Sequence, residues 1–231
     1  SLVEVILNDA ARIAQEDRMH EPLYTDEEVE QVLKMIQVVE YDTPVVVGDL
    51  SITFRDAGHI LGSSTIEVID QKDNKKIVFS GDLGNTPEDI VRPTHFIDKA
   101  DVVVMESTYG DSTHPDDEPT QILQEAINQT EKTGGILLIP AFSIERTQEI
   151  LHRIHHLKKE KKMGADTPVF LDSPMAIRTT LIFKEFKTFY NEELRSHTDD
   201  PFSFEGLVIS ESARDSKEII QAMEPKVIIA G

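Results

Sequence analysis

The first part of the chain, up to about residue 45, has apolar positions at the spacing of amphipathic helices. In "LVEVILNDAARIA", residues 2–14, apolar side chains recur every three or four positions, which predicts a helix with one buried face. A second helix is predicted over "TDEEVEQVLKMI", residues 25–36, because Thr25 followed three residues later by Glu28 matches a capping box. Its apolar face consists of Val29, Val32, Leu33 and Ile36.

Residues 45–83 change to β-branched runs, which predict strands. These runs are "TPVVVGDLSITFRDA", "SSTIEVID" and "KKIVFSGD". The polar stretch "QKDNKK" between the last two predicts a hairpin turn with Asp73 and Asn74 at its tip. The short connections favour antiparallel pairing.

From residue 101 onward, short apolar runs alternate with helical patterns. This alternation is typical of an α/β fold in which helices flank a mainly parallel sheet. The polar stretch "DSTHPDDEPT", residues 111–120, is the best candidate for a linker. Strands are predicted at 101–108, 136–142, 167–173, 206–212 and 226–231, and helices at 120–135, 143–164, 174–196 and 213–224.

Composition limits the classes of protein to consider. The 231 residues contain no cysteine, which excludes disulfides and thiolate metal sites and fits a cytoplasmic protein. No apolar run approaches the ~20 residues that cross a bilayer, and no leader pattern is visible, so we expect no membrane association. The net charge is −20, which repels nucleic acid in bulk. Residues 151–200 are nevertheless balanced, with 8 acidic and 9 basic side chains, so a polyanion would bind there more readily than to the first 150 residues.

Three polar residues directly follow predicted strands. His59 lies in "FRDAGHILGSS", Asp82 in "IVFSGDLGN", and Glu106 in "DVVVMESTYG". A single histidine is more often structural, and each acid could instead belong to a capped turn. Their shared position after strands favours one site, because an imidazole and two carboxylates are donors for zinc and other divalent cations. Asp82 has glycines nearby that would let the backbone turn sharply.

Two further turns suggest phosphate binding. "PAFSIERTQE" contains Ser143 and Arg146, and "FLDSPMA" contains Ser173. Each turn leads from a strand into a helix, whose free N–H groups, with a hydroxyl and a guanidinium, suit a phosphate. Ordinary N-capping by the two serines is an equally good interpretation. "HRIHH", residues 152–156, has helical metal-site spacing, but a solvated helix face near a lysine run explains it better.

In order and spacing, the motifs resemble a known group. "DAGHILGSS", "FSGDLGN", "VMESTYGD" and "GGILLIPAFSIERTQEIL", followed by "FLDSPMA" and "ISESARDSKEI", are similar to the metallo-β-lactamase-fold enzymes of the β-CASP group. That group acts on RNA or DNA, and includes ribonuclease J and the endonuclease of eukaryotic pre-mRNA 3′-end cleavage. The resemblance covers nearly the whole chain.

The resemblance implies roles for the three strand-end residues. His59 matches a histidine that ligates one of two zinc ions, and Asp82 matches the carboxylate that bridges both. Glu106 matches an acid that orients a histidine further along the chain. The group also carries an upstream H-x-H-x-D-H cluster and two later histidines, and this sequence contains none of them. Because the chain starts at Ser1 and stops after an apolar strand, we expect a fragment and not a degenerate member.

The resemblance and the pattern together predict a partial metallo-β-lactamase αββα domain at 1–115 and an incomplete β-CASP domain at 116–231. The longer protein is expected to be a two-zinc ribonuclease that hydrolyses phosphodiesters through a metal-bound hydroxide. We expect single-stranded RNA as its partner, bound with help from Ser143, Arg146 and Ser173. The sequence leaves open whether the protein forms a homodimer. The isolated chain should be inactive. The alternatives are a non-catalytic scaffold subunit of an RNA-processing complex and a small-molecule metallohydrolase of the same fold.

Overall fold

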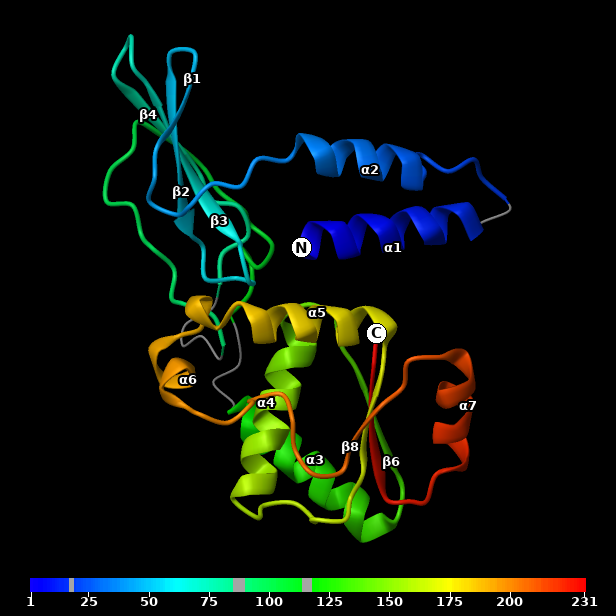
Figure 1. The fold of residues 1–231 in the computed structure, drawn as a ribbon. Coiled ribbons are helices and arrows are strands. Elements are labelled where there is room, and N and C mark those ends of the chain that lie inside the picture. The colour runs from blue at the N-terminus through cyan, green and yellow to red at the C-terminus, as the bar shows by residue number, and fades with distance from the viewer. Residues whose placement is uncertain (17–18, 85–89, 114–117) are drawn as a thin grey trace. The chain divides into compact units, whose positions relative to one another are not determined.

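The computed structural model describes residues 1–16, 19–84, 90–113 and 118–231. By its internal contacts the chain divides into two compact units (Figure 1). The first unit comprises Ser1–Ile36, Asp116–Glu185 and Asp199–Gly231, and the second comprises Gln37–Pro115 and Phe186–Thr198. The predicted domain boundary at 115/116 and the middle of the predicted linker fall among 114–117, outside the described residues, so the boundary stays a prediction.

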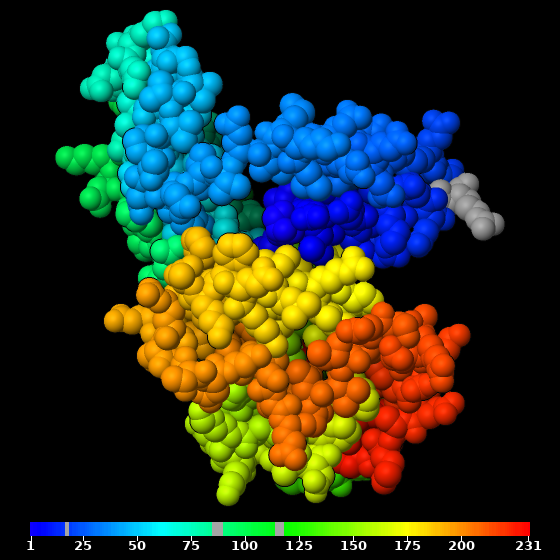
Figure 2. Space-filling model, viewed as in Figure 1, coloured from blue at the N-terminus to red at the C-terminus, as the bar shows by residue number. Residues whose placement is uncertain are grey.

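The first unit begins with the two predicted helices, α1 (Leu2–Glu16) and α2 (Asp26–Met35). Glu28 closes the capping box, since its carboxylate accepts the backbone N–H of Thr25 at 2.7 Å. The predicted apolar face is buried only in part, because Val29 is 2% exposed while Val32 is 46% exposed. Side chains of α1 pack against those of α5 (Pro174–Glu185), as Figure 2 shows.

The second unit contains a five-stranded sheet with strands in sequence order. The strands β2, β3 and β4 pair antiparallel as predicted, whereas β5 pairs parallel to β4. The predicted hairpin turn lies at residues 71–74, where Asn74 has φ 52°. The strands are β1 (Val45–Val47), β2 (Leu50–Asp56), β3 (Ser64–Asp70), β4 (Lys75–Phe79) and β5 (Val102–Val104).

The predicted single helix over 174–196 is wrong. Helix α5 ends at Glu185, a 3₁₀ turn η1 (Lys187–Phe189) follows, and α6 (Glu192–Ser196) starts after the N-cap Asn191. The interruption belongs to the second unit, where the Asn191 N–H donates to the Ile90 carbonyl at 2.8 Å. The 2% exposed Tyr190 forms a bridge with Val91. Tertiary pairing and burial here override a sequence that has helical character throughout.

The first unit also holds a four-stranded, fully parallel sheet in the order β6-β9-β7-β8. This confirms the predicted parallel sheet with flanking helices. Helices α3 and α4 lie on one side of this sheet and α7 on the other (Figure 1). Helix α3 ends at Gly134, which takes the left-handed conformation with φ 68°. The elements are α3 (Pro119–Thr133), β6 (Ile136–Pro140), α4 (Arg146–Lys159), β7 (Val169–Asp172), β8 (Leu207–Ile209), α7 (Ala213–Gln221) and β9 (Lys226–Ala230).

A buried lysine from β9 caps the C-terminal end of α7. Lys226 is fully buried, and its Nζ donates to the carbonyls of Ile219, Ile220 and Ala222 at 2.9, 3.2 and 2.9 Å. The last carbonyls of a helix have no partners within the helix and carry its negative dipole end, so an ammonium group stabilises them. The first residue of β9 therefore joins the C-terminus of α7 to the sheet.

None of the helices in the described ranges is long and apolar enough to span a bilayer.

The substitution Lys226→Met should lower the free energy of unfolding by about 3 kcal/mol, because it keeps the stem but leaves buried carbonyls without a donor. Urea denaturation of the two proteins measures this difference. Lys217→Met, at an exposed position on α7, is the matched control and should change stability by less than about 0.5 kcal/mol. Equal effects of the two substitutions would show that Lys226 does not hold the helix end.

Candidate active site

The topology of the second unit brings three predicted site residues to one edge of its sheet. Because β2 and β4 each pair antiparallel with β3, they run in the same direction, and β5 runs parallel to β4. The carboxyl ends of β2, β4 and β5 therefore meet at the same edge. His59 follows β2, Asp82 follows β4, and Glu106 follows β5.

The loop that carries His59 is held by side chains on both sides. The hydroxyl oxygen of Ser63 accepts the N–H groups of His59 and Ile60 at 3.1 and 3.2 Å. The Tyr41 hydroxyl donates to the Ser63 carbonyl at 2.7 Å, and burial raises the pKa of Tyr41 to about 12. His59 itself is exposed, so a fixed backbone presents a side chain that a ligand can reach.

The end of β2, next to this loop, is fixed by a charged contact. Asp56 lies 3.3 Å from the guanidinium of Arg92, and burial raises the pKa of the Asp56 carboxyl. The Arg92 guanidinium lies over the rings of Tyr41 and Phe189, at 5.6 and 4.6 Å from their centroids. Cation–π contacts of this kind favour a fixed guanidinium, and Phe189 links the segment 186–198 to the base of the His59 loop.

The turn that carries Asp82 lies against the His59 loop. The N–H of Gly84 donates to the Ala57 carbonyl at 2.9 Å. A Cβ at Gly84 would lie 1.7 Å from the Gly58 carbonyl oxygen and 2.9 Å from the His59 nitrogen, so only glycine allows this approach. Gly81 has φ 58°, a conformation that glycine adopts without strain, and this agrees with the predicted sharp turn at Asp82.

Glu106 fixes the same turn from the other side. Its Oε1 accepts the Leu83 N–H at 2.8 Å, and its own N–H donates to the Ser80 hydroxyl at 3.0 Å. The Leu83 N–H is the main cause that lowers the pKa of Glu106, followed by Thr108, with His59 adding a weaker electrostatic contribution. Glu106 therefore acts on the backbone next to Asp82, which its sequence position did not reveal.

The donors present fit part of a metal site. His59 and Asp82 are exposed and Glu106 is half-buried, and their loops adjoin. No group of three or more His, Asp or Glu side chains is placed to hold a metal within the described ranges. Structural and catalytic zinc sites use at least three protein ligands, so these residues are too few to form such a site by themselves, and their assignment as ligands stays a prediction.

Ser143, Arg146 and Ser173 lie in the first unit, at the carboxyl ends of β6 and β7. The Ser143 and Ser173 hydroxyls are 3.2 Å apart, and both serines are buried. Ser173 also accepts the Ala176 N–H at 3.2 Å, which is the capping role considered as the alternative. Arg146 is 57% exposed and pairs with Glu149 at 2.8 Å. The structure thus joins the two serines and leaves the arginine at the surface.

Two features of this turn are not apparent from the motif. Glu145 has φ 62° and ψ −62°, and the Arg146 N–H donates to the Ile144 carbonyl at 2.8 Å, which forms a strained γ-turn. Gln148 is fully buried, and its Nε2 donates to the Ser143 carbonyl and to the Thr180 hydroxyl. A glutamine on the apolar face of α4 was the available signal for this network.

The histidines of "HRIHH" are half-buried on α4, which corrects the expectation of a fully solvated face. The His155 Nε2 lies 3.6 Å from Asp199, which also accepts the Lys159 ammonium at 2.7 Å. Lys159 is the main cause that lowers the pKa of Asp199 to about 2. The rings of His152 and His156 meet edge to face, with centroids 4.5 Å apart, so the cluster makes packing and polar contacts within the first unit.

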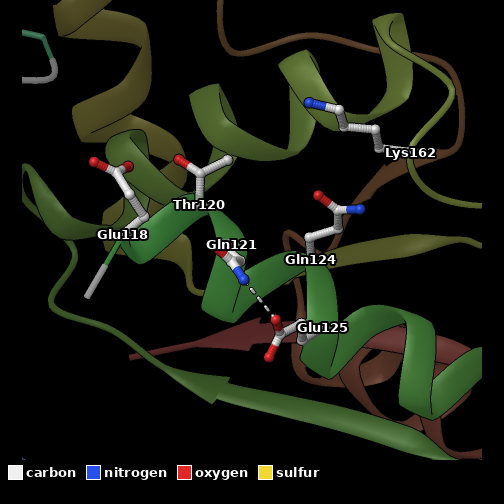
Figure 3. A pocket seen from close by; sticks show the side chains of 6 residues that line it. All are labelled: Glu118, Thr120, Gln121, Gln124, Glu125 and Lys162. Atoms are coloured by element: carbon white, nitrogen blue, oxygen red, sulfur yellow. Dashed lines mark hydrogen bonds between the residues drawn. The ribbon is translucent and has the colours of Figure 1, made fainter.

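A polar pocket of about 400 Å³ lies in the groove between α3 and the end of α4 (Figure 3). Gln121 donates to Glu125 at 2.9 Å across it, and Lys162 comes from beyond the C-terminal end of α4. This end of α4 is opposite to the end that carries Ser143 and Arg146, so the pocket is separate from the predicted phosphate site. Its lining residues are Glu118, Thr120, Gln121, Gln124, Glu125 and Lys162.

Glu106→Gln should lower the free energy of unfolding by about 1 kcal/mol at pH 7, because it replaces a charge-assisted hydrogen bond to Leu83 with a neutral one. The folded-state pKa of Glu106 is lowered, so its contribution is present above the usual pKa and is lost as the pH falls through the folded value. The difference from wild type should therefore shrink below about pH 4. Thermal unfolding at several pH values measures it, with Glu40→Gln, at an exposed position in the same unit, as the control. A difference that is constant with pH would contradict this role.

Comparison with known proteins identifies a domain in the second half of the chain and several relatives. The family model described as "Beta-Casp domain" matches residues 147–231. Ribonuclease TTHA0252 of Thermus thermophilus is 35% identical over 238 residues, which cover 100% of this chain and 52% of the relative. The transcription termination factor FttA of Pyrococcus abyssi is 30% identical, with 94% of this chain and 34% of the relative covered.

A eukaryotic relative shows the same pattern. Endoribonuclease YSH1 of Kluyveromyces lactis is 25% identical, with 87% of this chain and 28% of the relative covered. The chain spans about half the length of the Thermus relative and about a third of the other two. The chain therefore carries a β-CASP domain at residues 147–231, and its similarity to these relatives extends over 87–100% of its own length.

Proposed function

We propose that the chain is part of a zinc-dependent nuclease that hydrolyses RNA phosphodiester bonds. The observation that carries the proposal is the convergence of His59, Asp82 and Glu106 at one sheet edge, on loops that touch through Gly84 and Ala57. The relatives that are named ribonuclease or endoribonuclease support RNA as the substrate.

The residues present divide the work at the proposed centre. His59 and Asp82 would hold metal through an imidazole nitrogen and a carboxylate, and both side chains are exposed for that purpose. Glu106 would position Asp82, because its carboxylate fixes the Leu83 N–H at 2.8 Å. When bound, zinc ions supply a nucleophile at neutral pH and stabilise charge on the phosphoryl oxygens. Further ligands would come from outside these 231 residues.

Ser143, Arg146 and Ser173 would bind substrate phosphate at the other site. The 57% exposed Arg146 guanidinium would turn from Glu149 to a phosphate, since a guanidinium binds phosphate oxygens through charge-assisted hydrogen bonds. The two serines would act mainly by shaping the turns, since their hydroxyls contact each other. We propose single-stranded RNA as the form bound. A homodimer and a cytoplasmic location stay predictions from the sequence.

The purified 231-residue chain should bind zinc weakly or not at all, because His59 and Asp82 are fewer than the three protein ligands of a stable site. Isothermal titration calorimetry with zinc measures this for the wild-type chain and for His59→Ala. Heat that is the same for both would agree with the expectation. Tight, stoichiometric binding that His59→Ala abolishes would show that the chain completes a site by itself.

In the full-length protein, Asp82→Asn should reduce cleavage of single-stranded RNA by more than about 100-fold, since loss of groups that only support metal ligands already costs 10- to 100-fold. Asp73→Asn, in the exposed hairpin turn, is the matched control and should cleave like wild type. The readout is product formation on gels, with DNA and acyl substrates run in parallel. A full-length protein that binds RNA without metal-dependent cleavage would favour the scaffold alternative, and hydrolysis of acyl substrates alone would favour the small-molecule hydrolase.

A further inference from the structure

Three strand-to-helix turns of the parallel sheet share one composition. Each contains a serine that is followed within five residues by an arginine. Because the strands are parallel, all three turns lie at the carboxyl edge of the sheet, from which α4, α5 and α7 start. Neighbouring strands are ~4.8 Å apart, so the edge from β6 to β8 spans about 14 Å. The pairs are Ser143 and Arg146, Ser173 and Arg178, and Ser212 and Arg214.

The order of the strands makes this edge suitable for a ligand. The chain advances from β6 to β7 to β8 and then turns back to insert β9 between β6 and β7. Connections that start at the carboxyl edge therefore leave to both faces, with α4 on one side and α7 on the other (Figure 1). In open parallel sheets, ligands bind outside the carboxyl ends of the strands where the order reverses. Arg178 and Arg214 follow the two neighbouring strands β7 and β8 at this reversal.

The arginines at this edge can reach a polyanion. Arg178 is exposed and makes no ion pair with any part of the chain that the structure describes. Arg214 is 87% exposed, and its partner Glu218 is itself 65% exposed. Such i,i+4 pairs contribute only about 0.3–0.5 kcal/mol, so a phosphate can displace the glutamate.

Several acidic groups near the edge are engaged by neighbours. Asp172 accepts the hydroxyls of Ser210 and Ser216, both at 2.8 Å. Asp215 accepts the N–H and the hydroxyl of Ser212 in a capping box. Glu211 is exposed and adds a further negative charge, so this edge offers its arginines as individual phosphate contacts and not as a net positive surface.

An aromatic side chain accompanies the arginines. Phe142 is 85% exposed although its backbone is fixed, because its carbonyl accepts the N–H and the hydroxyl of Thr147 at 3.2 and 2.8 Å. A rigidly mounted, exposed ring beside a basic side chain is the arrangement that stacks an unpaired base. Arg146 starts the helix four residues later.

The densest basic run of the chain does not offer a comparable surface. Lys158 donates to the carbonyls of Gly164, Ala165 and Thr167 at 2.9, 2.7 and 2.8 Å. Lys159 pairs with Asp199. The Lys158 ammonium thus holds the loop that follows α4, and Lys159 holds Asp199, both at the opposite end of α4 from Arg146.

We propose that the carboxyl edge of the β6-β9-β7-β8 sheet is a track for single-stranded RNA, on which Arg178 and Arg214 contact phosphates and Phe142 stacks against a base. The track rests on the proposed function for the identity of its ligand, and extends that function by assigning Arg178, Arg214 and Phe142, which the motifs did not single out.

The test is fluorescence anisotropy of a short labelled single-stranded RNA with the full-length protein in EDTA, so that binding is measured without cleavage. Arg178→Glu and Arg214→Glu should each reduce the slope of log K against log salt concentration by about 0.7, the value for one lost phosphate contact on a single strand. Phe142→Ala should weaken binding by roughly 5- to 100-fold with little change in slope.

Matched controls separate the track from general effects of charge and fold. Lys161→Glu reverses an exposed charge at the other end of α4, and Phe96→Ala removes a ring that is 77% exposed in the second unit. Both should bind RNA like wild type. Circular dichroism checks that each variant is folded. If Arg178→Glu is not folded, Arg178→Gln, which removes the charge without reversing it, takes its place.

Three results would overturn the track. If wild type binds RNA and the edge variants bind equally well, the track is wrong while the proposed nuclease function stands. If wild type binds no RNA under any salt condition, both fail together. Weaker binding by Lys161→Glu than by Arg178→Glu would place the contact at the lysine run instead.

Discussion

The candidate centre depends on the close approach of two loops, at Gly58 and Gly84. The Gly84 N–H reaches the Ala57 carbonyl at 2.9 Å, and a Cβ at residue 84 would lie 1.7 Å from the Gly58 oxygen. No other residue type fits there without separating the loops. Because His59 and Asp82 lie on either side of this contact, their distance is set by backbone geometry and not by the side chains themselves.

The contact in turn requires the sheet beneath it. Three strands of the second unit point their carboxyl ends to one edge because two antiparallel pairings return the chain to its first direction. Glu106, at the end of the parallel strand β5, then fixes the Leu83 N–H. Ser63 and Tyr41 do the same for the His59 loop from the opposite side. Hydrogen bonds made by Ser63, Tyr41 and the Glu106 carboxylate thus fix the two loops that carry the groups proposed to bind metal.

The sequence was informative where local pattern and topology agree. Local patterns of apolar and polar residues located both sheets, the hairpin turn and the capping box at Thr25, because these features depend on nearby residues. Strand ends located His59, Asp82 and Glu106, because a polar residue after an apolar strand must leave the core. The motifs between residues 134 and 219 also indicated the β-CASP domain that the family model matches over 147–231.

Features that depend on distant contacts could not be read in this way. The break in the helix over 174–196 arises from pairing of Tyr190 with Val91, nearly one hundred positions earlier. The buried roles of Lys226 and Gln148 depend on carbonyls and hydroxyls of other elements. The buried position of Ser143 follows from the approach of a second turn, which no window of sequence around that residue contains.

The place of β9 in the parallel sheet has a consequence for synthesis. Residues 226–230 follow every other strand of that sheet in the chain but occupy its interior, between β6 and β7. During translation, β6 and β7 are therefore made well before the strand that joins them. Their inner edges stay open to foreign strands for that interval, a situation in which non-local parallel sheets aggregate. The ribosome synthesises the central strand β9 after the other strands of this sheet, so the nascent chain needs protection from foreign strands until then.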